Sequence, residues 1–371
     1  MLKVEIHSGR IRDNFFLLGR KTSSRVMAVI KADAYGHGLE ETARCLYRAG
    51  ADRFGVGSVK EGARLRGCLD TPEIYSLLGP VSPEDYQLLA QHRIIPFIHS
   101  WEQLKALKEV ACSFSGTIPV VLKLETGMNR LGFRGVDLQQ LLQVWEECPG
   151  LKLHMLASHL SLADDIRGRQ EVLGQLRVFE QCCRAVQAKG YVFERSLANS
   201  AAILAHPETH LDCVRPGISL YGDNPFENTP WASKGEGLAQ AMQVKAPVLA
   251  VHDLEKGGGV SYGLCFTAPR DMRIAIIGCG YADNYSRGLS NRGWMFYQGR
   301  RLPVLGRVCM QLSVVDATHA GDIKPGCEVY VLGGQGPQAV SAREMAGWLN
   351  SISYEIFCSL GKNPRVCNGL G

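Results

Sequence analysis

The 371-residue sequence has no stretch that approaches about twenty uninterrupted apolar residues, and no apolar segment of the secretory kind follows its first residues. Lysine and arginine are scattered rather than clustered, and the net charge is only +5. Neither a membrane nor a nucleic acid is therefore an expected partner. Low-complexity tracts are also absent, which excludes a disordered chain. We expect a globular protein of the cytoplasm.

The thirteen cysteines include no C-x-x-C pair. Several stand in apolar segments, among them Cys213, Cys279 and Cys309. Buried thiols in a reducing compartment are therefore expected, rather than a disulfide framework or a metal site.

Short apolar runs recur through the first 220 residues, and helical patterns lie between them. Most of these runs are apolar at nearly every position, which is typical of parallel strands covered on both faces. An open, doubly wound sheet would alternate in the same way, but the count of eight favours a (β/α)8 barrel of the TIM type. The expected strands are 25–31, 53–58, 73–79, 93–99, 118–125, 151–159, 193–200 and 213–222.

A change of texture marks a second domain. Pro225 and Pro230 stand among glycines and serines, as in a linker. Strand-like runs dominate beyond this point, and a long helical pattern is rare before 341–357. The sequence predicts a barrel at 1–236, followed by a mostly β domain at 237–371.

In such a barrel, functional side chains lie at the C-terminal ends of the strands. The polar residues and backbone positions that this rule brings to one mouth are Lys31, Arg130, His159, Asn199, Ser200, Arg215, Gly217 and Ile218. An amine that faces an anion pocket is typical of a pyridoxal phosphate (PLP) site. Gly36 and Gly38 are expected to let the loop after Lys31 turn away. For Lys31 alone, the plain interpretation is a strand-end lysine that extends into solvent.

The motifs along nearly the whole chain are together similar to those of alanine racemases, PLP enzymes of fold type III. The segment AVIKADAYGHG (28–38) resembles the family's cofactor-lysine motif. The others follow in the family's order: GMNRLGF, SHLS, ANSAA, VRPGISLYG, VSYG, GYAD, GRVCM and SYEI. The resemblance implies a PLP-binding barrel, a β domain, and a homodimer in which each active site is completed by the partner's β domain.

This resemblance also implies a reaction. The enzyme would interconvert L-alanine and D-alanine through an external aldimine of PLP, by two-base proton transfer, and supply D-alanine for peptidoglycan. Proton removal and return must take place on opposite faces of a planar carbanion, so two bases are needed. Lys31 would be one base, and Tyr262 of VSYG, entering from the partner subunit, would be the other.

Further roles follow from the matching positions. The cofactor-binding residues would be Lys31, Tyr35, His159, Asn199, Ser200, Arg215, Gly217, Ile218 and Tyr354. Arg130 and the backbone at Met310 would receive the substrate carboxylate, and Lys123 matches a position often occupied by a carbamylated lysine. The stretch resembling the family's substrate entryway contains Tyr281 and Arg287.

Two positions bear on the reaction type. If Arg215 faces the pyridine nitrogen, its permanent charge keeps that nitrogen unprotonated, whereas the related decarboxylases have a carboxylate there. A decarboxylase is therefore disfavoured. Gln311 replaces an aspartate that is usual in the family, so a serine or broad-specificity amino-acid racemase is an alternative. A non-catalytic PLP carrier is another, although the domain that holds Tyr262 argues against it.

Overall fold

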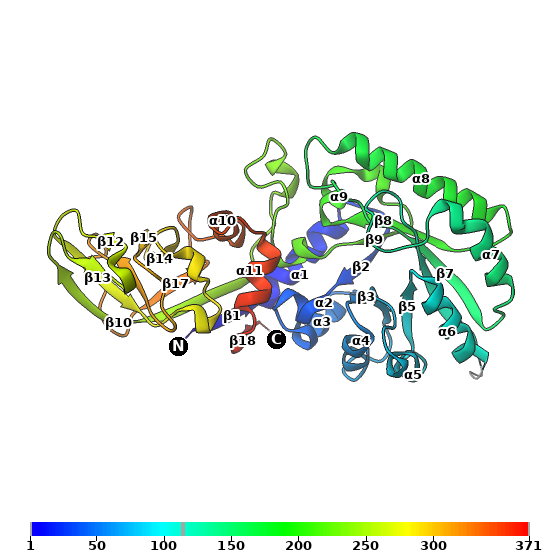
Figure 1. Ribbon diagram of the computed structural model, residues 1–371, viewed down its shortest axis with the longest axis horizontal. Coiled ribbons are helices and arrows are strands. Elements are labelled where there is room, and N and C mark those ends of the chain that lie inside the picture. Colours follow the sequence, from blue (N-terminus) through cyan, green and yellow to red (C-terminus); the bar gives the residue numbers. More distant parts are fainter. Residues whose placement is uncertain (1, 113–115, 370–371) are drawn as a thin grey trace. The chain divides into compact units, whose positions relative to one another are not determined.

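The computed structural model describes residues 2–112 and 116–369 (Figure 1). The chain forms two compact units. One combines the residues up to Arg10 with Tyr35–Gly38 and the residues from Ala239 onward; the other consists of Ile11–Ala34 and Leu39–Leu238. Within the described part of the chain, no helix is both long enough and apolar enough to span a bilayer.

The larger unit contains a closed barrel of eight strands, all paired in parallel. All eight predicted strands are present in chain order. The pairing of β2 with β9 closes the ring and excludes the open-sheet alternative. The strands are β2 (Arg25–Val29), β3 (Arg53–Val56), β4 (Glu73–Ser76), β5 (Ile94–Ile98), β6 (Ile118–Lys123), β7 (Leu151–Ala157), β8 (Glu194–Asn199) and β9 (Cys213–Arg215).

Helices follow the strands and surround the barrel (Figure 1). Every residue of β3 and of β5 is buried, as expected for strands covered on both faces. α3 buries Leu39, Ala43 and Leu46, a helical spacing that places one face against the barrel. The helices are α1 (Ser8–Gly19), α2 (Lys31–Tyr35), α3 (Leu39–Arg48), α4 (Val59–Arg66), α5 (Pro83–His92), α6 (Trp101–Cys112), α7 (Leu138–Glu146), α8 (Arg169–Gln187) and α9 (Ser200–Ala205).

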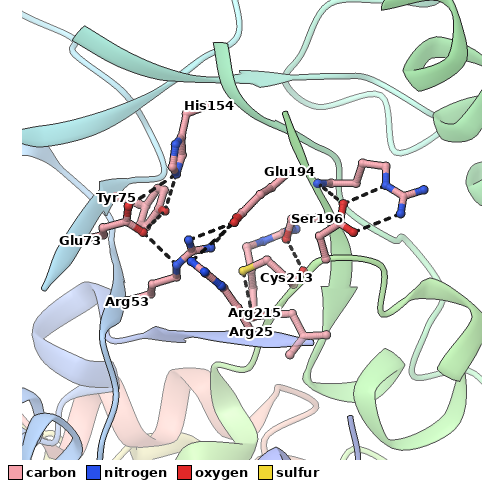
Figure 2. Close-up of polar contacts among 12 residues, drawn as sticks. Arg25, Arg53, Glu73, Tyr75, His154, Glu194, Ser196, Cys213 and Arg215 are labelled. Carbon is pink, nitrogen blue, oxygen red and sulfur yellow. Dashed lines mark hydrogen bonds and ion pairs between the residues drawn. The ribbon is translucent and has the colours of Figure 1, made fainter. Parts of the chain in front are cut away.

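An ion-paired cluster occupies the N-terminal end of the barrel strands (Figure 2). Arg53, the first residue of β3, is only 2% exposed. Its Nε lies 2.8 Å from Oε2 of Glu73, and its Nη2 donates to Oε1 of Glu194 at 3.1 Å. The Tyr75 hydroxyl donates to Glu73 at 2.8 Å and lies 2.9 Å from Nε2 of His154. Because functional sites of such barrels lie at the opposite end, this cluster is structural.

The other unit is built on one sheet in the order β13-β16-β15-β14-β17-β10-β1-β18, with a separate β11-β12 pair. Most pairs are antiparallel, and β1 with β18 is parallel. Its strands are β1 (Lys3–His7), β10 (Met242–Leu254), β11 (Gly259–Val260), β12 (Phe266–Thr267), β13 (Met272–Ile277), β14 (Trp294–Tyr297), β15 (Arg300–Leu305), β16 (Ser313–Asp316), β17 (Glu328–Leu332) and β18 (Arg365–Asn368).

The helical pattern at 341–357 forms two helices rather than one, α10 (Ala342–Trp348) and α11 (Ser353–Leu360). Asn350, between them, has a φ of 53°, which a continuing helix does not allow. Of the cysteines expected to be buried, Cys213 and Cys279 are buried and Cys309 is half-buried.

Candidate functional site

Lys31 is exposed at the C-terminal end of the barrel strands. β2 ends at Val29, two residues earlier than the predicted strand. The residues after Lys31 form a left-handed turn: Ala32, Asp33, Ala34 and Tyr35 have φ values of 53°, 54°, 55° and 53°. The expectation that Gly36 and Gly38 make this turn was therefore incomplete, because non-glycine residues make it first. Each costs about 1–2 kcal/mol in this conformation, and such strain is typical of functional sites.

His159 lies near several cations: Arg215 contacts it, and Lys123 and Arg130 line the same hollow. Burial lowers the pKa of His159 well below its usual value, and the charges of Arg215, Arg130, Lys123 and Lys31 lower it further. The imidazole is therefore neutral at physiological pH. The cationic residues predicted for one barrel mouth are brought together there by the structure.

Arg215 is held by neutral groups, of which Ser196 is labelled in Figure 2. Its Nη1 donates to Oγ of Ser196 at 2.6 Å, and its Nη2 donates to the Ser158 carbonyl at 2.5 Å. Nδ1 of His159 lies 3.5 Å from the same Nη2. Burial lowers the pKa of Arg215 to about 10. Among the described residues, none of these contacts is with a carboxylate. The positive charge of the guanidinium is therefore available to a ligand.

Ser196 is a site residue that the sequence interpretation missed. Its hydroxyl donates to the Cys213 carbonyl at 2.7 Å while it accepts from Arg215, so it fixes the orientation of the guanidinium. A fully buried serine inside a barrel strand needs a hydrogen-bond partner. That requirement was the available signal, but the sequence does not name the partner.

Ser200, Gly217 and Ile218 lie together at the same end of the barrel. Oγ of Ser200 accepts from the N–H groups of Gly217 at 2.9 Å and Ser219 at 3.3 Å. Asn199 has a local contact as well: its Oδ1 caps α9 by accepting from the Ala202 N–H at 3.0 Å. Converging hydroxyl and backbone N–H groups of this kind suit a phosphate.

Lys123 and Arg130 line a small hollow together with His159. Burial lowers the pKa of Lys123 to about 8, and the charges of Arg130, Arg215 and Lys31 contribute. Glu125 orders the loop that carries Arg130, because its carboxylate accepts from the N–H groups of Gly127 at 2.5 Å and Arg130 at 3.1 Å.

Tyr35 and Tyr354 belong to the sheet-containing unit, where their ring centroids are 5.7 Å apart. Burial raises the pKa of Tyr35 above its usual value, and neighbouring Tyr354 and Cys358 raise it further. The tyrosine is therefore protonated at physiological pH and can act as a hydrogen-bond donor.

Three predicted motifs converge around Tyr262 in the same unit. Oγ of Ser261 donates to the Arg307 carbonyl at 2.7 Å, which joins VSYG to GRVCM. The N–H of Tyr281 donates to the Cys309 carbonyl at 3.0 Å, which joins GYAD to the same segment. Tyr262 itself is 72% exposed.

Five exposed large hydrophobic side chains lie in these motifs or close to them in the chain, and we call the group the tyrosine surface. It consists of Tyr262, Leu264, Tyr281, Met310 and Leu312. Leu264 is 65% exposed and Met310 is 59% exposed. Contiguous apolar surfaces on a folded chain commonly mark an interaction site.

Two family models match the chain: "Alanine racemase, N-terminal domain" over residues 6–225 and "Alanine racemase, C-terminal domain" over residues 241–367. The alanine racemase of Nitratidesulfovibrio vulgaris (strain DSM 19637 / Miyazaki F) is 45% identical over 365 residues, which cover 98% of this chain and 97% of that protein. The alanine racemase of Lawsonia intracellularis is 39% identical over 364 residues, covering 97% and 95% of the two chains.

Solved structures agree with these relatives. The structure of alanine racemase from D-cycloserine-producing Streptomyces lavendulae aligns with a TM-score of 0.92 at 29% identity, over 99% of this chain and 97% of that one. The structure from Bartonella henselae, which has covalently bound pyridoxal phosphate, aligns with a TM-score of 0.87 at 30% identity, over 99% of each chain. The similarity extends over both units.

Proposed function

The chain belongs to the alanine racemase family, and from that premise we propose that Lys31 and Tyr262 are the two bases of its reaction. It is a PLP-dependent isomerase that interconverts L-alanine and D-alanine. The observation that carries the placement of the site is that Arg215 contacts His159 at 3.5 Å and that Lys123 and Arg130 line one hollow with it, at one barrel end. An anionic cofactor and the carboxylate of an amino acid both require such surroundings.

The residues of the barrel fit PLP, which supplies an electron sink for a carbanion when it is bound. Lys31 would hold the cofactor covalently in this proposal, and Arg215, whose described partners are neutral, would be the residue that interacts with the ring nitrogen. The residues proposed to hold the phosphate or to surround the ring are Tyr35, His159, Asn199, Ser200, Gly217, Ile218 and Tyr354. The hydrogen bond from the Gly217 N–H to Oγ of Ser200 supports this proposal because it brings two of the proposed phosphate-binding residues together.

The proton steps are assigned to two faces of the substrate. On one face the free amine of Lys31 would take the Cα proton, or its ammonium form would return it. On the other face the phenolate of Tyr262 would take the proton, or the phenol would return it. His159 is neutral and accepts at Nδ1 from Arg215, so its Nε2 carries the proton. We propose that this N–H donates a hydrogen bond to the phenol oxygen of Tyr262.

Arg130 and the Met310 backbone are proposed to bind the substrate carboxylate. Lys123 supports Arg130 through a carbamate: its neutral amine adds to the carbon of CO2 and releases one proton, which leaves an anion on the side chain. A pKa of about 8 provides a fraction of neutral amine at physiological pH. The resulting negative charge attracts the Arg130 guanidinium.

The exposure of Tyr262 supports a homodimer with shared active sites. Tyr262 is 72% exposed in its own chain, so a second chain would be needed to enclose it in an active site. In this proposal, the predicted domain 1–236 contributes Lys31 to an active site of its own chain. The predicted domain 237–371 contributes Tyr262 to the active site of the partner. We place the enzyme in the cytoplasm, where its buried thiols are kept reduced, and propose that its D-alanine serves peptidoglycan synthesis.

Replacing the two bases tests the assignment. Lys31→Ala should abolish the absorbance band of the lysine-bound cofactor. Tyr262→Phe should keep that band but slow deuterium incorporation at Cα from L-alanine more than from D-alanine, because one face loses its base. Equal slowing from both enantiomers would remove Tyr262 from this role, and a band that persists in Lys31→Ala would remove Lys31.

A broader substrate range is the alternative that Gln311 favours. This residue is exposed beside Met310, where a polar side chain could meet the substrate. Turnover of alanine, serine and other free amino acids decides the matter: faster turnover of serine than of alanine would establish the broader enzyme.

A further inference from the structure

A carboxylate from the first turn of α4 holds the turn that follows Lys31. The backbone N–H of Asp33 donates to Oε1 of Glu61 at 3.1 Å. The other oxygen, Oε2, accepts from the N–H groups of Gly57 at 2.7 Å and Ser58 at 3.3 Å. One side chain therefore joins the turn after β2 to the loop after β3.

Glu61 is itself held by a capping box at the start of α4. Its N–H donates to Oγ of Ser58 at 3.1 Å, and its carboxylate reaches back to the Ser58 N–H. Gly57 leaves room for this arrangement, since a Cβ added there would lie 3.0 Å from Oε2 of Glu61 and 3.5 Å from Cβ of Lys31. Lys31 and Glu61 thus both lie close to Gly57.

The turn needs such a partner because its backbone is unfavourable for L-residues. Two of its other contacts are local: the Ala34 N–H donates to the Ile30 carbonyl at 2.9 Å, and Oδ1 of Asp33 accepts from the Leu39 N–H at 2.9 Å. Of these three contacts, the one with Glu61 connects the turn to the loop that follows β3.

We propose that Glu61 is a positioning residue for Lys31: its carboxylate holds the left-handed turn and thereby fixes the direction of the amine at the barrel mouth. This inference rests on the proposed role of Lys31 as the cofactor-binding amine. A carboxylate suits the task because it accepts from three N–H groups at once, and hydrogen bonds to a charged acceptor are stronger than neutral ones.

Glu61→Asp separates this role from capping. In α5, Asp85 occupies the same capping position, and its Oδ2 accepts from the N–H groups of Val81 and Ser82. An aspartate is therefore long enough to cap a helix of this barrel. Being one methylene shorter than glutamate, it should lose the Asp33 N–H. A second variant, Glu61→Gln, keeps the length and removes the charge.

Asp85→Asn is the matched control, because it weakens a capping box of the same kind in the loop after β4. Two readouts are needed: amide hydrogen exchange of Asp33 in cofactor-free protein, and the rate at which the lysine-bound cofactor's absorbance band appears after PLP is added. Both Glu61 variants should speed the exchange of Asp33 about tenfold and slow cofactor uptake about tenfold. The melting temperature of Glu61→Asp should stay near that of the wild type.

Unchanged Asp33 exchange and cofactor uptake in the Glu61 variants would overturn the proposal, as would equal losses in Asp85→Asn. A wild-type protein that forms no cofactor band would overturn the proposed function instead. In that case the exchange of the Asp33 amide would still decide whether Glu61 holds the turn.

Discussion

Backbone strain lies beside both proposed bases. Ala32, which follows Lys31, has a φ of 53°, and Ser261, which precedes Tyr262, has a φ of 63° and a ψ of −175°. The conformation of Ser261 is nearly exclusive to glycine and costs about 1–3 kcal/mol. Its hydroxyl donates to the Arg307 carbonyl at 2.7 Å. We infer that the strained conformation of Ser261 is kept because it positions Tyr262.

The two sources of energy at Ser261 can be separated by substitution. Ser261→Ala keeps the strain and loses the hydrogen bond, so it should lower the free energy of unfolding by about 1 kcal/mol. Ser261→Gly also loses the bond but relieves the strain, and should be the more stable of the two variants. Denaturant unfolding measures the difference, and a glycine variant less stable than the alanine variant would contradict the argument.

The lowered pKa of Lys123 predicts that the free energy of unfolding depends on pH. Its pKa is about 8 in the folded chain, against an ordinary value of 10.5. Between these two pH values the unfolded chain binds more protons, so the free energy of unfolding should rise with pH. The gain over this window should be about 2 kcal/mol once solvent screening is allowed for.

The measurement compares the cofactor-free wild type with Lys123→Met in CO2-free buffer, by denaturant unfolding from pH 8 to pH 10.5. The methionine variant should lack the extra slope, and identical slopes would exclude the shifted pKa. Adding 13C-bicarbonate to the wild type should give a carbamate NMR signal that is absent from Lys123→Met.

At the scale of elements, the two ends of the barrel strands have different tasks. Arg53, Glu73 and Glu194 stand at the first positions of β3, β4 and β8, whereas Lys31 and Ser200 follow the last positions of β2 and β8. Burial lowers the pKa of Arg53, but the hydrogen bond with Glu194 and the nearby carboxylate of Glu73 raise it overall. The guanidinium therefore stays charged and forms ion pairs with both carboxylates.

Arg53→Met should therefore affect stability and not chemistry. Loss of the buried cation leaves Glu73 and Glu194 without their main counter-charge, at a cost of about 3 kcal/mol in the free energy of unfolding. The control Arg25→Met removes a cation that is 62% exposed and 3.7 Å from Glu194, and should cost less than about 1 kcal/mol. Turnover per folded molecule should be unchanged in both variants, and a selective loss in Arg53→Met would refute the division of tasks.

At the scale of the whole molecule, the tyrosine surface argues for a partner. We expect these exposed apolar side chains, which include the proposed base Tyr262, to be buried in the proposed dimer. A two-fold symmetric pair would then contain two identical sites, each built from both chains.

Mixing two inactive variants tests this arrangement. After unfolding and refolding together, Lys31→Ala and Tyr262→Phe chains form mixed dimers in which one of the two sites has both bases. Random pairing should restore about a quarter of the wild-type activity. Each variant refolded alone is the control, and no recovery in the mixture would indicate that each chain supplies both of its own bases.

The sequence by itself determined the eight strands of the barrel and the β-rich character of the second part, but not that β1 and residues 35–38 join the sheet-containing unit. Eight apolar runs with helical patterns between them predicted the barrel, because strand and helix periodicities are local properties of the chain. Lys31, Arg130, His159 and Arg215 could be placed at one end because the C-terminal ends of parallel strands meet there.

Only the tertiary structure decided the left-handed turn after Lys31, the support of Arg215 by Ser196 and the bond from Asp33 to Glu61. The last two join residues that are 19 and 28 positions apart. Local propensity disfavours the turn at Ala32 and Ala34, and no local pattern identifies a hydrogen-bond partner on another strand. These features depend on contacts that exist only after the barrel has closed. A residue from a distant segment can then stabilise the strained backbone of the turn.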